Sequence, residues 1–234
     1  FVLTSLNQAA LTNTGGAAPV SGQAHAQDVT ITAGSESRTI EISANDSVRA
    51  IAKRINAVAG ATGVTAEART FARLSSVDTT GAATAKIKIN GTETAAFALS
   101  SSDVSDAVTK INAISATTGV QASATDDYKV LLTDKWGDTI KIQNTSTRTD
   151  VKVESLANNG TTPHGTAITM ATADANSSSA TVTGTMRLTS ATEFSLDSSA
   201  AGSSAGALAA ANAATTASVC TAAQIALVSL ASAE

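Results

Sequence analysis

The chain has 234 residues, a formal net charge of −4, 43% hydrophobic residues and only 3% aromatic ones. Its lysines and arginines are scattered and its aromatic residues are scarce. The sequence therefore lacks the basic stripe and the stacking surfaces that nucleic-acid binding needs. No apolar run approaches the roughly 20 residues of a membrane-spanning helix. The single cysteine, Cys220, excludes an internal disulfide and a multi-cysteine zinc site.

Residues 1–27 are rich in Ala, Thr, Asn and Gly, and they predict an irregular approach segment. The chain begins at Phe1, so we expect it to be part of a longer protein. Alternating residues such as Val29 and Ile31 then predict strands. The short polar side chain of Asn45 or Asp46 is expected to cap a helix. The apolar residues that follow at helical spacing predict one buried stripe: Val48, Ile51, Ile55 and Val58.

The same pattern returns at one constant offset of 56 residues. The matched pairs are Ile55 and Ile111, Asn56 and Asn112, Ala57 and Ala113, Gly63 and Gly119, Val64 and Val120, and Ala66 and Ala122. Each glycine stands where a helix is expected to end, and each following valine begins a strand. The second copy has Ser102 or Asp103 as its expected cap. Its predicted apolar stripe consists of Val104, Val108, Ile111 and Ile114.

Turn signals complete the second copy. Asn90-Gly91 predicts a hairpin turn ahead of its helix. Residues 130–132 and 140–142 predict a further hairpin around Trp136-Gly137-Asp138. Each copy is therefore predicted to be a strand-strand-helix-strand-strand unit, and the fold class to be α+β with much strand.

The rest of the chain gives weaker signals. Alternating Thr and Val predict short strands in residues 146–200, and Ala-rich residues 201–234 favour helix. The predicted organisation is an approach segment (1–27), a first unit (28–84), a second unit (85–145), a β-rich returning segment (146–200) and the Ala-rich segment (201–234).

The repeated pattern resembles the IN motif of bacterial flagellins and hook-associated proteins. Residues 182–194 also resemble the returning strand of a flagellin outer domain, and the likeness covers roughly residues 28–200. It implies β-rich outer domains on an extracellular filament that serves swimming. Copies of the chain would self-assemble through terminal segments that are mostly absent here, so no residues are assigned to those contacts. The motif residues are Asp46, Ile55, Asn56, Gly63, Val64, Asp103, Ile111, Asn112, Gly119 and Val120.

The sequence offers little for catalysis. His25 and His164 stand in expected loops, and no G-x-S-x-G or H-E-x-x-H motif accompanies them. We therefore expect no enzyme activity, no catalytic residue and no cofactor.

Four carboxylates could gather oxygen ligands for calcium: Asp126, Asp127, Asp134 and Asp138. They lack the spacing of a calcium loop, so we expect turn-forming carboxylates and no metal site. Trp136 and Tyr128 are expected to cover the small core of the second unit. Cys220 is expected to be a small buried residue.

Three functions are compatible with these patterns. The leading hypothesis is a structural subunit of the flagellar filament. The second is a hook-associated or filament-cap protein. The third is a flagellin-like surface protein that binds an anionic glycan through Arg49, Lys53 and Arg54, which are the candidate basic patch.

Overall fold

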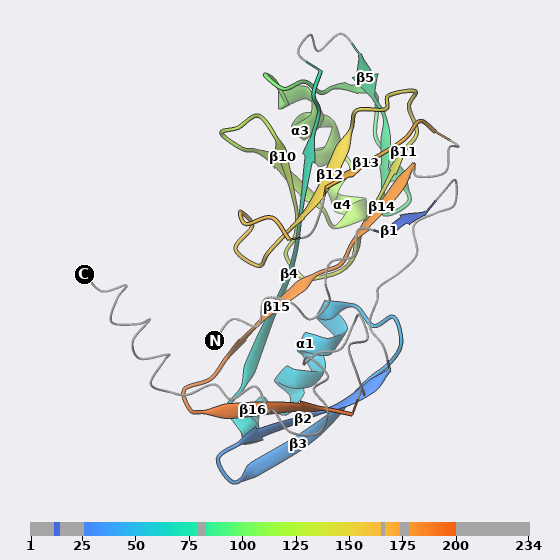
Figure 1. Ribbon diagram of the computed structural model, residues 1–234. Helices are drawn as coiled ribbons and strands as arrows, with labels where there is room; N and C mark the ends of the chain where they lie inside the picture. Colours follow the sequence, from blue (N-terminus) through green and yellow to red (C-terminus); the bar gives the residue numbers. More distant parts are fainter. Residues whose placement is uncertain (1–11, 15–25, 79–82, 165–166, 174–177, 200–234) are drawn as a thin grey trace, which may run out of the picture.

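The computed structural model describes residues 12–14, 26–78, 83–164, 167–173 and 178–199. It is β-rich, with 42% strand and 16% helix, as an α+β or mostly β fold requires. The described residues form two lobes that lie end to end (Figure 1). We call residues 26–69 and 183–199 the first lobe, and residues 12–14 together with the described residues of 70–182 the second lobe. The helix favoured for residues 201–234 and most of the approach segment lie outside the described residues.

The first lobe packs a helix against two small sheets. Its elements are β2 (Gln27–Ala33), β3 (Glu36–Ile42), α1 (Val48–Ala57), α2 (Ala59–Thr62), the first half of β4 (Thr65–Ser75), β15 (Thr185–Thr189) and β16 (Phe194–Ser198). One sheet has the order β16-β2-β3, and β15 pairs with the first half of β4. Their apolar side chains form one core with the buried side of α1.

The second lobe is a sandwich of two larger sheets with a helix beside it. Its elements are the second half of β4, β5 (Thr84–Ala85), β6 (Ile87–Ile89), β7 (Thr92–Glu93), β8 (Phe97–Ala98), α3 (Ser105–Asn112), α4 (Ser115–Thr118), β9 (Gln121–Ala124), β10 (Val130–Asp134), β11 (Ile140–Asn144), β12 (Lys152–Leu156), β13 (Ile168–Thr169) and β14 (Ser179–Val182). The sheet orders are β1-β14-β11-β6-β7, which includes β1 (Thr12–Thr14), and β13-β12-β4-β10-β9. Both sheets and α3 contribute to the second core.

Strand β4 passes through both lobes. Its first half pairs with β15, and its second half pairs with β10 and β12. Ala66 and Ala68 lie in the first core, whereas Ala72 and Leu74 lie in the second. Successive side chains of a strand alternate between its faces, so one face of β4 serves both cores. The chain leaves the first lobe along β4 and returns to it through β14 and β15.

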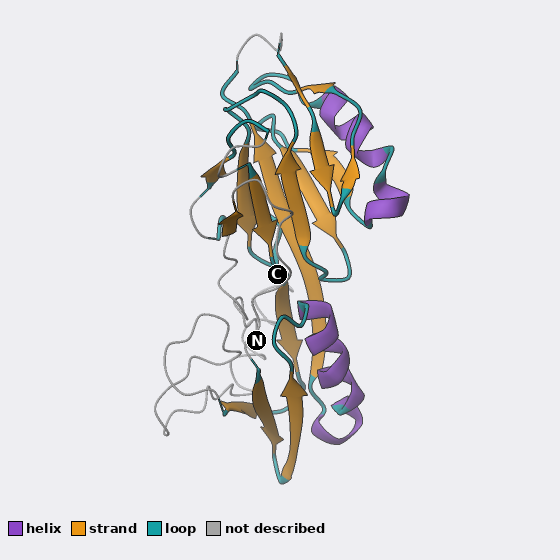
Figure 2. Cartoon of the chain, turned by 90° about the vertical axis from the view of Figure 1, so that its right-hand side faces the viewer, coloured by secondary structure: helices purple, strands orange, loops and turns teal. Residues whose placement is uncertain are grey.

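The two predicted apolar stripes face the cores. Val48, Ile51 and Ile55 are buried in the first core, and Val104 and Ile111 are buried in the second. The remaining stripe residues, Val58, Val108 and Ile114, pack against the cores while partly buried. Figure 2 shows that the helices of both lobes lie on the same side of the molecule.

The predicted Asn-Gly hairpin is confirmed. Ile89 pairs with Thr92 across the turn, and Asn90 and Gly91 both adopt positive φ, at 48° and 88°. These are the angles of the tight turn that matches the twist of paired strands.

The second predicted hairpin is wrong. Residues 130–132 and 140–142 do not form a hairpin, because β10 and β11 belong to different sheets. The segment 135–139 instead crosses between the sheets. In the first lobe, the first half of β4 pairs with β15, more than a hundred residues later, because the second lobe is inserted between them. The two tandem strand-strand-helix-strand-strand units stay a prediction.

Both long helices are followed by a short helical turn and a glycine in the left-handed region, Gly63 at φ 66° and Gly119 at φ 75°. Alanine at such an angle costs about 1–2 kcal/mol. We expect Gly63→Ala to lower the free energy of unfolding by about that amount in urea titrations. Gly60→Ala is the matched control, since a Cβ at this helical position meets no atom within 4 Å. The control should be neutral or stabilising by up to about 1 kcal/mol, and equal stability of the two variants would contradict the account.

Candidate functional site

The asparagine of each repeated motif holds the strand that follows its helix. The Asn56 side chain donates to the carbonyl of Ala66 and accepts from its backbone N–H, both at 2.8 Å. Asn112 makes the same two bonds to Ala122, at 2.9 and 2.8 Å. Each amide thus replaces the partner that a neighbouring strand would supply. We call this pair of bonds the asparagine clamp.

A threonine closes the turn between helix and strand in both copies. The Thr62 hydroxyl donates to the carbonyl of Val58 and accepts from the N–H of Val64. Thr118 makes the equivalent bonds to Ile114 and Val120. The sequence comparison did not single out these threonines, although they share the same offset of 56 residues.

The other motif residues divide between core and surface. Ile55, Val64, Ile111 and Val120 are completely buried, the first two in the first core and the other two in the second. The motif residues therefore gather in two places, one in each lobe, rather than in one site.

The expected helix caps are partly wrong. Ser47, not Asn45 or Asp46, caps α1 by accepting from the N–H of Ala50 at 3.2 Å. Asp46 instead accepts from the N–H of Ser43 and pairs with Arg54. At the second helix the N-cap position is Val104, not Ser102 or Asp103. Asp103 stands one residue earlier and accepts from the N–H of Ser105 at 2.9 Å, and this bond lowers the pKa of its carboxyl group.

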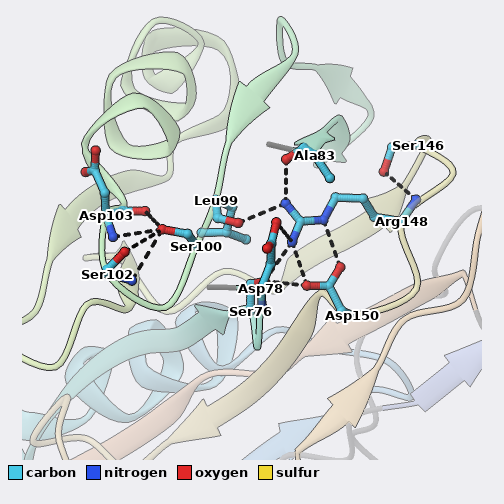
Figure 3. Close-up of polar contacts among 10 residues, drawn as sticks. All are labelled: Ser76, Asp78, Ala83, Leu99, Ser100, Ser102, Asp103, Ser146, Arg148 and Asp150. Atoms are coloured by element: carbon cyan, nitrogen blue, oxygen red, sulfur yellow. Dashed lines mark hydrogen bonds and ion pairs between the residues drawn. The ribbon is translucent and has the colours of Figure 1, made fainter. Parts of the chain in front are cut away.

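A second polar cluster surrounds Arg148, which is only 6% exposed (Figure 3). Its guanidinium donates five hydrogen bonds: to Asp150 at 2.8 and 2.5 Å, to the carbonyls of Ala83 and Leu99 at 2.8 Å, and to the Ser76 hydroxyl at 2.7 Å. An arginine has five N–H donors, so every one is used inside the protein. Arg148 therefore ties three loops together and has no donor left for a ligand.

Asn144 extends this cluster. It is fully buried, and its amide donates to the carbonyls of Arg148 and Ala171, both at 2.7 Å. Its side-chain oxygen accepts from the N–H and the hydroxyl of Ser146. Arg148 and Asn144 were not predicted from the sequence, because nothing in a local pattern marks which charged or amide side chain will be buried.

The four aspartates considered for calcium do not converge on one site. Asp134 is buried, and it accepts from the N–H groups of Trp136 and Asp138. Asp127 pairs with Lys129 at a separate turn. Among the described residues, no three His, Cys, Asp or Glu side chains are close enough together to hold a metal ion.

The candidate basic patch is divided by ion pairs. Arg49 binds Asp138 at 2.7 Å and Arg54 binds Asp46, which leaves Lys53 exposed between them. His164 is half-buried in a loop, whereas His25 and Cys220 lie outside the described residues.

The expectation for the two aromatic residues is wrong. Trp136 and Tyr128 are 56% and 53% exposed, so neither covers the second core. The Trp136 ring lies against Arg49 and Lys135 instead, with the cations 5.7 and 5.3 Å from its centroid. In the described part of the chain, no helix has both the length and the apolar character to cross a membrane.

The asparagine clamps should contribute equally in the two lobes. Asn56→Ala and Asn112→Ala each remove two hydrogen bonds, so we expect each to cost about 2 kcal/mol of unfolding free energy in urea titrations. Lys53→Ala is the control, an exposed residue of the same helix as Asn56, and it should change stability by less than about 0.5 kcal/mol. A cost for Asn56→Ala no larger than that of the control would overturn the clamp.

Asp150 makes the free energy of unfolding depend on pH in the acid range. Its hydrogen bonds with Arg148 lower the pKa of Asp150 from 3.8 to about 2. A carboxyl group with a lowered pKa stabilises the fold above its unfolded pKa, and this stability is lost as the pH falls from about 4 to 2. We expect the stability gap between the native chain and Asp150→Asn to shrink by about 2 kcal/mol over this range. Urea unfolding at pH 6, 4 and 2 measures the gap, and a constant gap would refute the assignment.

Comparison with known proteins identifies one segment. Residues 28–77 match the family described as Flagellin hook IN motif. This stretch runs from β2 through β4 and contains the Asn56 clamp, whereas the Asn112 clamp lies outside it. No curated protein matched the chain. The motif match supports a flagellin-like protein, as the sequence pattern indicated.

Proposed function

We propose that this chain is the outer, solvent-facing region of a flagellin, a structural subunit of the extracellular bacterial flagellar filament. The observation that carries the proposal is the match of residues 28–77 to the flagellin hook IN motif. The asparagine clamp within that motif occurs a second time at Asn112. On this proposal the partners are other copies of the protein, which assemble through terminal segments, and the lobes give the filament surface its bulk and character.

The path of the chain supports a projecting domain. The N–H of Asp28, near the start of β2, donates to the Ser199 hydroxyl at 2.8 Å, and the N–H of Ser199 donates to the Asp28 carbonyl at 2.9 Å. The start of β2 and the end of β16 therefore lie at adjacent points of the first lobe. Adjacent connections of this kind suit a domain that stands out from the body of a longer protein.

The chemistry of the described residues also suits a structural role. Arg148, the most buried cation among them, donates all five of its N–H groups to acceptors within the fold. The outward side of the β2–β3 hairpin carries paired hydroxyls, Thr30 with Thr39 at 2.9 Å and Thr32 with Ser37 at 3.2 Å. Such a surface is hydrophilic and exposes no large apolar side chain, which favours contact with water.

Peptide mass spectrometry on filaments sheared from the source cells tests the proposal. Trypsin cleaves after Arg54 and next after Arg69, so residues 55–69 should appear as one peptide. A bulk subunit predicts this peptide in the dominant filament band, at a molar amount close to that of the filament protein as a whole. Its absence from filaments, with recovery only from the cell envelope, would overturn the proposal.

The same measurement separates the hook-associated alternative, which the description of the matched motif also favours. A hook-associated or cap protein is present in few copies for each filament. The peptide would then be found in sheared filaments only in trace amounts.

A further inference from the structure

A loop of the second lobe contacts the N-terminus of helix α1 in the first lobe. Segment 135–139, between β10 and β11, lies at the N-terminus of α1. The carbonyl of Gly137 accepts from the N–H of Arg49 at 3.3 Å. The Asp138 carboxylate accepts from the Ser47 hydroxyl at 3.2 Å and from the Arg49 guanidinium at 2.7 Å. Ser47 is itself the cap of α1, so the second lobe binds the capping residue directly.

These contacts satisfy needs that a helix start always has. The first N–H groups of a helix lack partners within the helix, and this end carries partial positive charge. Residues next to the helix usually supply the missing acceptors. Here the Gly137 carbonyl, about ninety residues later and in the other lobe, accepts from the Arg49 N–H, and the Asp138 carboxylate brings a negative charge to the same end of the helix.

The backbones approach at this junction as closely as glycine allows. A Cβ on Gly137, which has φ 82°, would lie 2.4 Å from the Cβ of Ala68 on β4. A Cβ on Gly184, between β14 and β15, would lie 2.8 Å from the Gly137 carbonyl oxygen. The Thr70 hydroxyl on β4 donates to the Asp138 carbonyl at 2.7 Å. Segment 135–139 is thus packed against both strands that connect the lobes.

Segment 135–139 is also held in place by hydrogen bonds within the second lobe. The buried Asp134 accepts from the N–H groups of Trp136 and Asp138, at 2.8 and 3.2 Å. The Trp136 ring covers Arg49 on the outside of the junction. The acceptors therefore reach α1 already ordered, and docking them costs little conformational entropy.

From this geometry we propose that segment 135–139 is a latch that locks the two lobes into one rigid rod and couples their unfolding. Without it, the described residues join the lobes through β4 and the β14–β15 connection, and β4 can bend between Arg69 and Thr70. With it, the N–H of Arg49 in the first turn of α1 has its acceptor only while the second lobe is folded and docked. The inference concerns the isolated chain and holds whether or not the chain forms a filament.

Distance measurements between spin labels test the latch. One label is placed at Ser35 in the first lobe and one at Ser101 in the second, both exposed and both changed to cysteine in a Cys220→Ser background. Pulsed electron resonance should give one narrow distance distribution for the latched chain. Asp138→Ala removes the carboxylate that binds Ser47 and Arg49. Gly137→Ala forces segment 135–139 away from β4. Each variant should therefore at least double the width of the distance distribution. Asp127→Ala is the control, since it breaks an ion pair in the second lobe away from the junction.

Thermal unfolding monitored by circular dichroism supplies the second readout. The latched chain and the control should unfold in one transition, whereas the two latch variants should unfold in two, with the first lobe melting earlier. If Gly137→Ala fails to fold, Asp138→Asn retains the shape of the side chain and weakens the same bonds. Folded latch variants with the distance distribution and the single transition of the native chain would overturn the proposal.

Discussion

Strand β4 contributes to both hydrophobic cores, and the rest of the structure depends on the way its side chains alternate between two faces. Ala66 and Ala68 pack in the first core, and Ala72 and Leu74 pack in the second. All four side chains project from one face of a continuous strand. A twist of one lobe about this strand would withdraw apolar side chains from a core and expose them to water. The shared strand therefore fixes the faces of the two lobes relative to each other, as a flexible linker could not.

Because the cores contain few large side chains, side-chain hydrogen bonds are important for the stability of this fold. Only 3% of the residues are aromatic, so the cores consist mainly of Val, Ile, Leu and Ala side chains, which each bury less area than an aromatic ring. The fold adds side-chain bonds at the places where the backbone lacks a partner. The asparagine clamps hold the strand after each helix, and Arg148 ties three loops of the second lobe. These polar side chains thus make their hydrogen bonds within the fold.

The sequence predicted best what depends on local periodicity and turn chemistry. The stripe through Ile51 and Ile55 and the turn at Asn90-Gly91 follow from spacing alone. Prediction from the sequence failed where a strand or side chain pairs with residues far along the chain. Residues 130–132 and 140–142 look like a hairpin, yet their strands pair with β4 and β14 instead. The clamp asparagines were found through the repeat, but their role required the contact with Ala66 and Ala122. The burial of Arg148 and the inter-lobe role of Asp138 had no local signal.

The central claim is that the two lobes form the outer surface of a flagellar filament, and electron cryomicroscopy of filaments from the source cells tests it most directly. The account predicts a two-lobed projection on every subunit along the filament, with the lobes joined by two strands as β4 and the β14–β15 connection are here. Filaments of this protein whose surface lacks such projections, or that carry them only at their ends, would contradict it.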